Sequence, residues 1–336
     1  MGDPPRSEMV QPRDAAQAAK PVERSVPRAD AAAAMRFRRA LVDRGMQGVL
    51  ALAAASSIAV TLGIVYILIS ESVPFFRAVG IKDFLTDTMW TPQFAVPRYG
   101  IVPLLLGTLV TTMVALAVAL PVGSIIAIWL SEFAPARLRE TVKPVLELLA
   151  AVPTVVYGYF ALLFVTPLLQ RLWPDLPTFN MLGAGLVMGI MIIPYVSSLS
   201  EDAMRAVPML LREGSFAVGG NKIVTATRVV FPAALSGIAA AYVLGISRAV
   251  GETMIVAVAA GQQPLILDPA RPLDAVNPGQ PGATITAFIV SVSLGDVQHG
   301  EIGYQAIFAA GLTLFVATLG FNVAGYVLRK RFRQAY

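Results

Sequence analysis

The sequence predicts an all-α membrane protein with six transmembrane helices. Of its 336 residues, 56% are hydrophobic and only 14% are charged, and the mean hydropathy is +0.68. This composition is typical of polytopic membrane proteins rather than of soluble domains. Six apolar stretches are each long enough to cross about 30 Å of hydrocarbon at about 1.5 Å per residue.

The first 44 residues are polar, contain scattered prolines and are predicted to form a flexible cytoplasmic tail. We expect an uncleaved first span to follow, because no secretory signal opens the sequence. A single membrane domain is then expected over residues 45–335. Its predicted spans lie at about 46–70, 100–130, 146–170, 179–200, 233–261 and 303–328.

Prolines lie inside several predicted spans. The second span is overlong and contains Pro103 and Pro121, so we expect it to start outside the bilayer or to bend at Pro121. Pro153 and Pro194 interrupt the third and fourth spans, where neighbouring helices must satisfy the freed backbone groups.

The distribution of basic residues predicts the orientation. Twenty of the 26 lysines and arginines fall in residues 1–44, 131–145 and 201–232 and after the last span. Five fall in the alternate connecting segments, and the remaining one is Arg248. By the positive-inside rule both termini are cytoplasmic, and an even number of spans agrees with this.

The outer segment 262–302 is rich in Pro, Gly and Asn up to Gly282, and an apolar run, residues 283–294, follows. This run is too short to cross the bilayer, so we expect an interfacial or re-entrant helix. A seventh span is the rival interpretation, but it would place the Arg-rich C-terminus outside.

Missing residue types exclude several function classes. The chain has no cysteine, which excludes disulfides and thiolate chemistry, and its single histidine, His299, excludes His-rich metal sites. No lysine follows a glycine, so a Walker A loop is absent and the chain is not a P-loop ATPase by itself. An intramembrane hydrolase is an alternative class, but His-Glu-x-x-His and Gly-x-Gly-Asp are both missing. No metal or cofactor is expected.

An arginine and a glutamate stand in the middle of the predicted fifth span. Arg248 and Glu252 are four residues apart, so on one continuous helix they share a face and can pair. A charge at bilayer depth costs at least about 2.5–3.5 kcal/mol on insertion scales, and it normally faces a protein interior or a solute path. The guanidinium of Arg248 suits an oxyanion, and Glu252 would hold it when no anion is present. A buried structural ion pair is the alternative.

The predicted cytoplasmic loop 201–232 contains a second informative pattern. It reads Arg-Glu-Gly-Ser-Phe-Ala-Val-Gly from Arg212, then nine residues, then Val-Val-Phe-Pro ending at Pro232. This spacing resembles the Glu-Ala-Ala-x3-Gly-x9-Ile-x-Leu-Pro loop that importer permeases of the ABC class present to their ATPase. Glu213, Gly219 and Pro232 match it, whereas Gly and Ser replace the two alanines.

The loop is therefore expected to carry a short helix that begins after Pro208 and ends at Gly219-Gly220. The alternative is an ordinary loop helix packed on its own spans. The resemblance implies that the helix docks on the ATPase, and the residues expected at that contact are Met209, Arg212, Glu213, Phe216 and Gly219.

Two further stretches resemble the phosphate-specific members of the class. Residues 146–158 resemble the signature Leu-Glu-x-Leu-Ala-Gly-Ile-Pro-Ser-Val-Val-Tyr-Gly, with Thr154 in place of the usual Ser. Residues 248–254 resemble the Gly-Arg-Ala-x-Gly-Glu-Thr-Met stretch of the C-type subunit, the PstC family, and Met254 favours this type over its sister A-type. The resemblance covers about residues 80–328.

This resemblance implies a type I ABC importer permease fold and a transmembrane subunit of a phosphate importer in a bacterial inner membrane. The implied partners are a sister A-type permease (PstA-like) as heterodimer, two PstB-like ATPase subunits, a PstS-like extracytoplasmic phosphate-binding protein, phosphate and the lipid bilayer, with no nucleic acid. ATP hydrolysis would take place on a separate subunit, so the chain itself is not an enzyme. The alternatives are a permease for molybdate or sulfate, and an anion channel or carrier without ATP, against which the 201–232 loop argues.

Three other side chains are expected along the solute path. Thr154 and Tyr157 lie in the predicted third span and Thr108 lies in the second, and their hydroxyls can donate hydrogen bonds to an oxyanion. Ordinary helix packing, with hydroxyls bonded to carbonyls of the same helix, is the alternative for all three.

Overall fold

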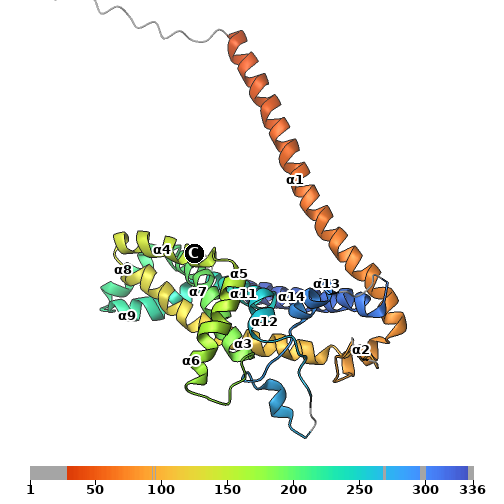
Figure 1. Cartoon of the computed structure of the whole chain (residues 1–336). Helices are drawn as coiled ribbons and strands as arrows, with labels where there is room; N and C mark the ends of the chain where they lie inside the picture. The colour runs from red at the N-terminus through yellow and green to blue at the C-terminus, as the bar shows by residue number, and fades with distance from the viewer. Residues whose placement is uncertain (1–28, 93, 95, 268–269, 296–299, 332–336) are drawn as a thin grey trace, which may run out of the picture. The chain divides into compact units, whose positions relative to one another are not determined.

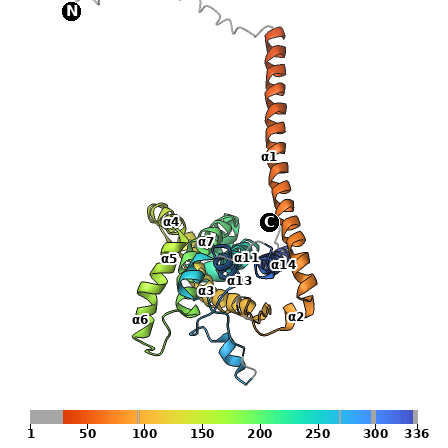
Figure 2. The ribbon, with the colours of Figure 1, turned by 45° about the vertical axis from the view of Figure 1, so that its right-hand side comes forward.

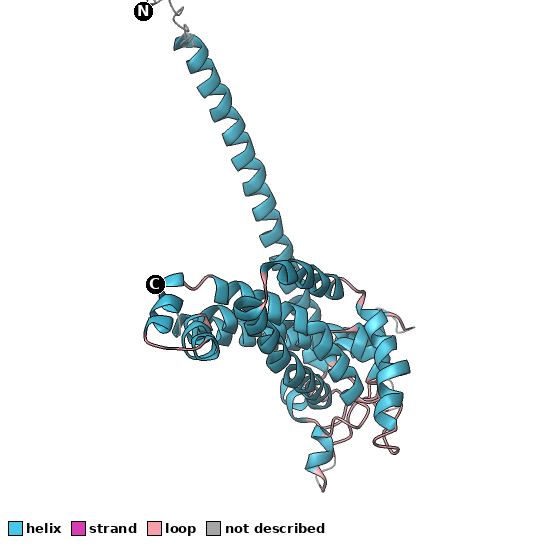
Figure 3. Cartoon of the chain, turned by 90° about the vertical axis from the view of Figure 1, so that its left-hand side faces the viewer, coloured by secondary structure: helices cyan, strands magenta, loops and turns pink. Residues whose placement is uncertain are grey.

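A computed structural model describes residues 29–331 apart from residues 93, 95, 268–269 and 296–299. Every regular element in these residues is a helix (Figure 3). An isolated antiparallel bridge joins Trp90 to Tyr99. The prediction of an all-α chain is confirmed. The chain divides into two compact units, with the boundary between Gly63 and Ile64.

The first helix, α1 (Ala29–Ala78), begins earlier than the predicted first span. Residues 29–44, which the sequence placed in a flexible tail, are helical, whereas residues 1–28 of that tail lie outside the described residues. The run of alanines from Ala31 to Ala34 consists of the strongest helix formers and accounts for this early start. From Ile64 onward α1 belongs to the second unit, together with the helices that follow.

The second and fourth predicted spans correspond to α3 (Val102–Ile128) and α7 (Met181–Arg205), which pack against each other in the second unit (Figure 1). Pro103 lies in the first turn of α3, where its missing N–H leaves no helical bond unmade. Both helices run through an internal proline without ending, at Pro121 in α3 and at Pro194 in α7.

Two glycines of α7 permit a close approach to α3. A Cβ atom at Gly185 would lie 2.7 Å from the side chain of Val114, and one at Gly189 would lie 2.8 Å from the carbonyl oxygen of Ala115. Small residues four positions apart are a common device for close helix packing in membranes. The α3–α7 pair is therefore held at a distance that larger side chains would not allow.

The predicted third span is not one straight helix. α4 (Ala136–Ala150) is followed by a break, and the chain continues at an angle of 86° through α5 (Thr154–Phe160) and α6 (Thr166–Gln170) (Figure 2). Pro153 accounts for the break, because a residue before proline is driven out of the helical conformation.

The predicted fifth span, residues 233–261, begins at a bend and is interrupted once within its length. A bend of 73° separates residues 222–233, which include α9 (Lys222–Val224) and α10 (Phe231–Ala233), from α11 (Leu235–Val250). Beyond Gly251 the chain resumes as α12 (Met254–Ala259). The expected continuous helix over 233–261 is thus wrong.

The apolar run 283–294 forms α13 (Ile285–Ser293), which begins at the side-chain cap of Thr284. Most of its apolar residues are buried in contact with α3, α12 and α14 (Ile302–Arg331). Burial on several sides fits a re-entrant helix and argues against an interfacial one. The remaining helical elements are α2 (Ile81–Thr86), α8 (Met209–Ala217) and the short 3₁₀ segment Pro272–Val276.

Three helices contain a wide, π-helical turn, and each of these turns ends two residues before a proline. They are Trp129–Phe133 before Pro135, Ala161–Val165 before Pro167 and Thr225–Val230 before Pro232. In each, the residue just before the proline donates its N–H to the carbonyl five residues back. A proline ring clashes with the carbonyl four residues back and offers no N–H, and a π turn relieves both problems.

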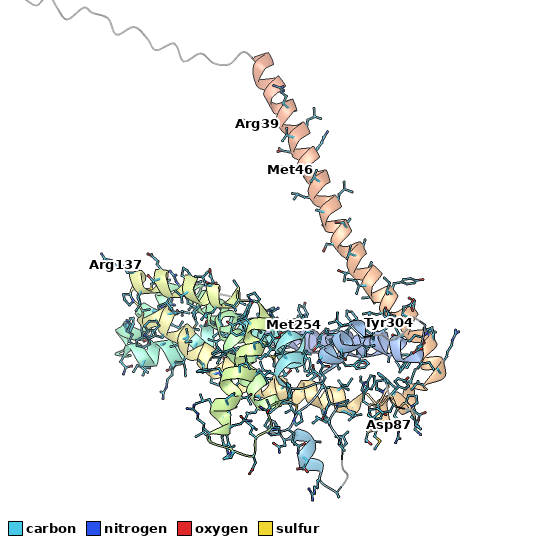
Figure 4. The ribbon with its side chains drawn as sticks, in the orientation of Figure 1. Arg39, Met46, Asp87, Arg137, Met254 and Tyr304 are labelled. Atoms are coloured by element: carbon cyan, nitrogen blue, oxygen red, sulfur yellow. The ribbon has the colours of Figure 1, made fainter. Side chains whose placement is uncertain are left out.

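Four helices in the described part of the chain are long and apolar enough to cross a membrane, and the count rises to six if each bent pair forms one span. The chain is therefore a multi-pass membrane protein. Arg137 of α4 and Asp87, just after α2, lie at opposite ends of the second unit (Figure 4).

Candidate functional site

The break between α11 and α12 separates the two charges of the predicted fifth span. Arg248 lies in the last turn of α11, which ends at Val250, and Glu252 lies beyond the end of that helix. Among the described residues Arg248 forms no salt bridge, with Glu252 or with any other carboxylate. The expected ion pair on one helix face is therefore wrong, because the helix on which it depended ends at Val250.

The guanidinium of Arg248 is exposed in this chain and lies over an aromatic ring. Its central carbon is 5.6 Å from the ring centroid of Tyr195, a residue of α7. The face of an aromatic ring attracts a cation at this distance. Tyr195 therefore holds a cation in position without neutralising its charge.

Glu252 is buried and bonds to backbone groups. Its Oε1 accepts from the backbone N–H of Met254 at 3.2 Å and of Ile255 at 3.4 Å, so the carboxylate caps the start of α12. Its own carbonyl accepts from the hydroxyl of Thr286 at 2.7 Å. The break at 251–253 is thus fixed by contacts with α12 on one side and α13 on the other.

Thr108 reaches the same region from α3. Its hydroxyl donates to the carbonyl of Leu104 at 2.8 Å and accepts from the backbone N–H of Ile285 at 3.2 Å. The hydroxyls of Thr284 and Thr286 lie 3.0 Å apart, which continues the network to Glu252. Two of the predicted path residues, Thr108 and Glu252, are therefore brought together by α13.

Tyr157 and Thr154 lie at the other broken helix. The hydroxyl of Tyr157 donates to the carbonyl of Leu149 at 2.8 Å, and that of Tyr195 lies 3.4 Å from the carbonyl of Ala150. Both tyrosines thus reach the last two carbonyls of α4, beside the break. Thr154 opens α5 and is half-buried.

The two breaks lie close together in the second unit. A Cβ atom at Gly158 of α5 would lie 3.2 Å from the carbonyl oxygen of Met254 and 3.0 Å from the side chain of Val258 in α12. Met254 is labelled in Figure 4 in the middle of this unit, between the ends marked by Arg137 and Asp87. An exposed guanidinium beside two helix breaks is suited to a transient contact with an anion.

No group of three or more His, Cys, Asp or Glu in the described part of the chain could hold a metal ion. His299 lies outside the described residues.

The loop 201–232 carries the helix that its sequence predicts. α8 begins after Pro208 and ends at Ala217, and the N–H groups of Gly219 and Gly220 donate to the carbonyls of Phe216 at 3.0 Å and Ser215 at 2.9 Å. This pattern is a Schellman motif, and Gly219 has the positive φ of 86° that the motif needs. The predicted role of Gly219 in ending the helix is confirmed.

One face of α8 is exposed in this chain. Met209, Glu213 and Phe216 of the predicted set lie on it, and Leu210 and Val218 are more exposed still, at 77% and 87%. Val218 was not among the residues predicted to contact the ATPase. Its position just before Gly219, where the helix ends, is the one sequence feature that could have indicated its exposure.

Arg212, in contrast, faces its own chain. Its Nη2 atom lies 2.9 Å from Oε1 of Glu132, and its guanidinium also donates to the carbonyls of Met204 and Val207. It therefore differs from the other four residues expected at the ATPase contact. No sequence signal pointed to Glu132, because eighty positions separate it from Arg212.

The comparisons with known proteins agree with this architecture. Residues 119–334 match the family described as "Binding-protein-dependent transport system inner membrane component". The chain belongs to this family. Members are permeases that work with a binding protein and an ATPase, so the chain is one membrane subunit of a larger transport system.

Two curated relatives illustrate its place in the family. The chain is 31% identical over 272 residues to the "Probable ABC transporter permease protein YqgH" of Bacillus subtilis, covering 80% of this chain and 83% of that protein. It is 35% identical over 270 residues to the "Phosphate transport system permease protein PstC 1" of Mycobacterium tuberculosis, covering 74% and 77%.

Solved structures share the fold of this inner membrane component. A bacterial ABC transporter that imports the acidic polysaccharide alginate has a chain with a TM-score of 0.59 and 14% identity, covering 88% of this chain and all of that one. The inward-facing methionine transporter MetNI has a TM-score of 0.50 and 17% identity, covering 70% and 95%. At these identities the likeness shows the ABC importer permease fold alone.

Proposed function

We propose that the chain is the C-type transmembrane subunit of an ATP-driven importer of inorganic phosphate. The observation that carries the proposal is the guanidinium of Arg248, which is exposed next to a break in a membrane helix and has no carboxylate partner among the described residues. An unpaired cation at bilayer depth is costly and marks a solute path. The likeness to relatives named as phosphate transport permeases supports phosphate as the anion that it meets.

Arg248 offers the planar fork that matches phosphate oxygens, and Tyr195 keeps this fork directed while leaving its charge available. Glu252 and Thr108 act on the path by fixing the break, since Glu252 bonds to α12 and α13 and Thr108 bonds to α13. Tyr157 and Thr154 border the path at the break between α4 and α5. A site with one cation holds its anion weakly, which suits a subunit that must also release it.

In this proposal the chain crosses the bacterial inner membrane six times, with both termini and the 201–232 loop on the cytoplasmic side. It pairs with a sister A-type permease, and two PstB-like ATPase subunits bind below, one of them on the exposed face of α8. An extracytoplasmic PstS-like protein delivers phosphate from the other side. ATP is hydrolysed by the ATPase subunits.

The test is purification of the chain with its partners in mild detergent, followed by reconstitution in liposomes. We expect an ATPase to co-purify and phosphate to stimulate ATP hydrolysis more than molybdate or sulfate does. If only molybdate or sulfate stimulates ATP hydrolysis, that anion and not phosphate is the solute. If phosphate crosses the liposome membrane with no ATPase bound to the chain, the chain is an anion channel or carrier and not part of an ATP-driven importer.

A further inference from the structure

Arg212 of α8 and Glu132 form an ion pair that ties the loop helix to the end of α3. Glu132 lies in the π-helical turn Trp129–Phe133 that continues α3. The Nη2 atom of Arg212 lies 2.9 Å from Oε1 of Glu132, and its Nε atom lies 3.3 Å from both carboxylate oxygens. The two side chains are only 11% and 8% exposed, so solvent screens their attraction weakly.

The same guanidinium also binds the end of α7. Its Nη1 atom donates to the carbonyl of Val207 at 2.7 Å, and its Nη2 atom donates to the carbonyl of Met204 at 2.9 Å. The hydroxyl of Ser131 donates to the same Glu132 carboxylate at 2.9 Å, which holds the carboxylate in place. One side chain of α8 is therefore bonded to both α3 and α7.

The contacts of α8 divide into two sides. Towards the chain, Arg212 is bonded as described, Leu211 packs against the buried cluster around Met204, and the hydroxyls of Ser215 and Thr225 lie 2.8 Å apart. On the other side lie the exposed side chains described above. A force that a partner applies to the exposed side chains of α8 is therefore transmitted to α3 and α7 through the contacts of Arg212 and Leu211.

The α3–α7 pair leads from this end to the region of Arg248. Its close approach at Gly185 and Gly189 leaves little room for the two helices to slide. Tyr195, which lies under Arg248, belongs to α7, and Thr108, which contacts α13, belongs to α3. A displacement of the pair would therefore move both groups that surround the break at 251–253.

We propose that Arg212 and Glu132 are the positioning pair that transmits movement of α8 to the α3–α7 pair and thereby to the break at 251–253. This proposal rests on the proposed function, in which an ATPase binds the exposed face of α8. Arg212 is in that case an internal link of the permease rather than a contact residue of the ATPase.

The test follows nucleotide-driven movement at the break in the assembled complex. The chain has no native cysteine, so Thr253→Cys introduces a single reporter in this chain at the break. Its labelling by a maleimide is compared with and without ATP and vanadate. In the reporter background we expect a change in labelling rate, and Arg212→Ala should reduce that change at least about fivefold, the lower end of typical coupling between sites.

Further variants separate the link from a general effect on folding. Glu132→Gln keeps an oxygen that can accept from Arg212 but removes its charge, so an intermediate loss is expected. Arg212→Lys keeps the charge but lacks the planar fork that spans the carboxylate and both carbonyls, so it should behave similarly. Arg137→Ala is the matched control. It removes an exposed arginine of α4 that has no salt bridge among the described residues, and the movement should stay unchanged.

The amount of ATPase that co-purifies is measured for every variant. If Arg212→Ala binds a normal amount of ATPase but loses the nucleotide-dependent change in labelling rate, the link is supported. If Arg212→Ala keeps the full change in labelling rate, the link is refuted. Should Arg212→Ala not assemble, Glu132→Gln and Arg212→Lys decide instead, and a full movement in both overturns the link. The labelling readout needs no solute, so it tests the link independently of the proposed solute. A wild-type complex whose labelling changes with nucleotide but whose ATP hydrolysis does not respond to phosphate would refute phosphate as the solute. The Arg212 and Glu132 variants would still decide whether the link exists.

Discussion

The ring of Tyr195 lies beneath the guanidinium of Arg248, with 5.6 Å between the ring centroid and the central guanidinium carbon. These residues come from α7 and α11, two helices that pack together in the second unit. The hydroxyl of the same tyrosine reaches the carbonyl of Ala150 at 3.4 Å, at the end of α4. One side chain therefore connects the only intramembrane arginine of the predicted spans to the first of the two helix breaks.

Replacing Arg248 by Gln should lower phosphate uptake per assembled complex by about tenfold or more, because a lost hydrogen bond to a charged group costs about 1.5–3 kcal/mol. Arg248→Lys should restore part of the uptake, since an ammonium keeps the charge but lacks the planar fork. Uptake is measured in liposomes and divided by the amount of complex. Normal uptake per complex in Arg248→Gln would show that the arginine is structural.

Changes at Tyr195 separate its ring from its hydroxyl. Tyr195→Phe should leave the apparent phosphate affinity unchanged, because a 3.4 Å hydroxyl contact is weak. Tyr195→Leu should lower it about two- to fivefold, since a cation over an exposed ring gains about 0.5–1 kcal/mol. The affinity is read from phosphate-stimulated ATP hydrolysis. Equal losses in both variants would contradict the role assigned to the ring.

Gly219→Leu should uncouple the chain from its ATPase. The backbone there has φ of 86°, and a non-glycine residue in this conformation costs about 1–2 kcal/mol. Gly219→Asn should be milder, because asparagine tolerates this region better. Gly214→Ala is the control: it lies within α8, no atom lies within 4 Å of the added Cβ, and alanine favours the helix.

The readout for these variants is phosphate-stimulated ATP hydrolysis, together with the amount of ATPase that co-purifies. Wild-type stimulation in the Gly219→Leu complex would be incompatible with the coupling role of this turn.

A buried carboxylate links α4 to α7 near the same end of the second unit. Glu201 is fully buried, and it lies 2.8 Å from Nζ of Lys143 and 3.6 Å from Nη1 of Arg205. Lys143→Ala should lower stability by up to about 3 kcal/mol, since the buried carboxylate then keeps only the longer contact with Arg205. The double variant Lys143→Ala with Glu201→Gln should be more stable than Lys143→Ala alone.

Thermal unfolding in detergent measures this difference, and the single variant Glu201→Gln serves as the reference for the loss of the carboxylate. A double variant no more stable than Lys143→Ala would mean that the buried charge is not the cause.

Cysteine labelling tests the proposed orientation. Ile266 is 84% exposed in the predicted outer segment, and Arg228 is exposed in the predicted cytoplasmic loop. In intact cells a membrane-impermeant maleimide should label Ile266→Cys and should reach Arg228→Cys only after permeabilisation. The absence of native cysteine in this chain makes the result simple to assign, and the reverse pattern would invert the topology.

Hydropathy was sufficient to find the membrane helices, because their apolar content is high and local. The two breaks were harder to predict. Pro153 was a visible signal for the first, although a proline inside a helix does not always end it, as Pro121 and Pro194 demonstrate. The second break combines a local cap, in which Glu252 accepts from the N–H of Met254, with a hydroxyl from Thr286, a residue distant in the sequence whose contact the local pattern could not reveal.

In the loop helix, too, some features could be predicted from the local sequence and others could not. Its start after Pro208 and its end at Gly219 follow from local backbone chemistry and were predicted. The direction of Arg212 was not, because a helix face is assigned by its surroundings and the partner carboxylate belongs to another helix. Local sequence thus places an element, whereas distant contacts decide which of its side chains remain available.

The wide turns before Pro135, Pro167 and Pro232 bear on how this chain is aligned with its relatives. A π turn holds one residue more than an α turn, so the turns before Pro167 and Pro232, which continue into helix, each act as a single-residue insertion that shifts the angular position of the helical residues that follow. The turn before Pro135 instead ends its helix at Ala134. Homologues that lack Pro167 or Pro232 have no need for the extra residue, and we expect them to be one residue shorter just upstream. Proline loss and a one-residue gap should therefore occur together during evolution, whereas either change alone would turn the following helix face away from its neighbours.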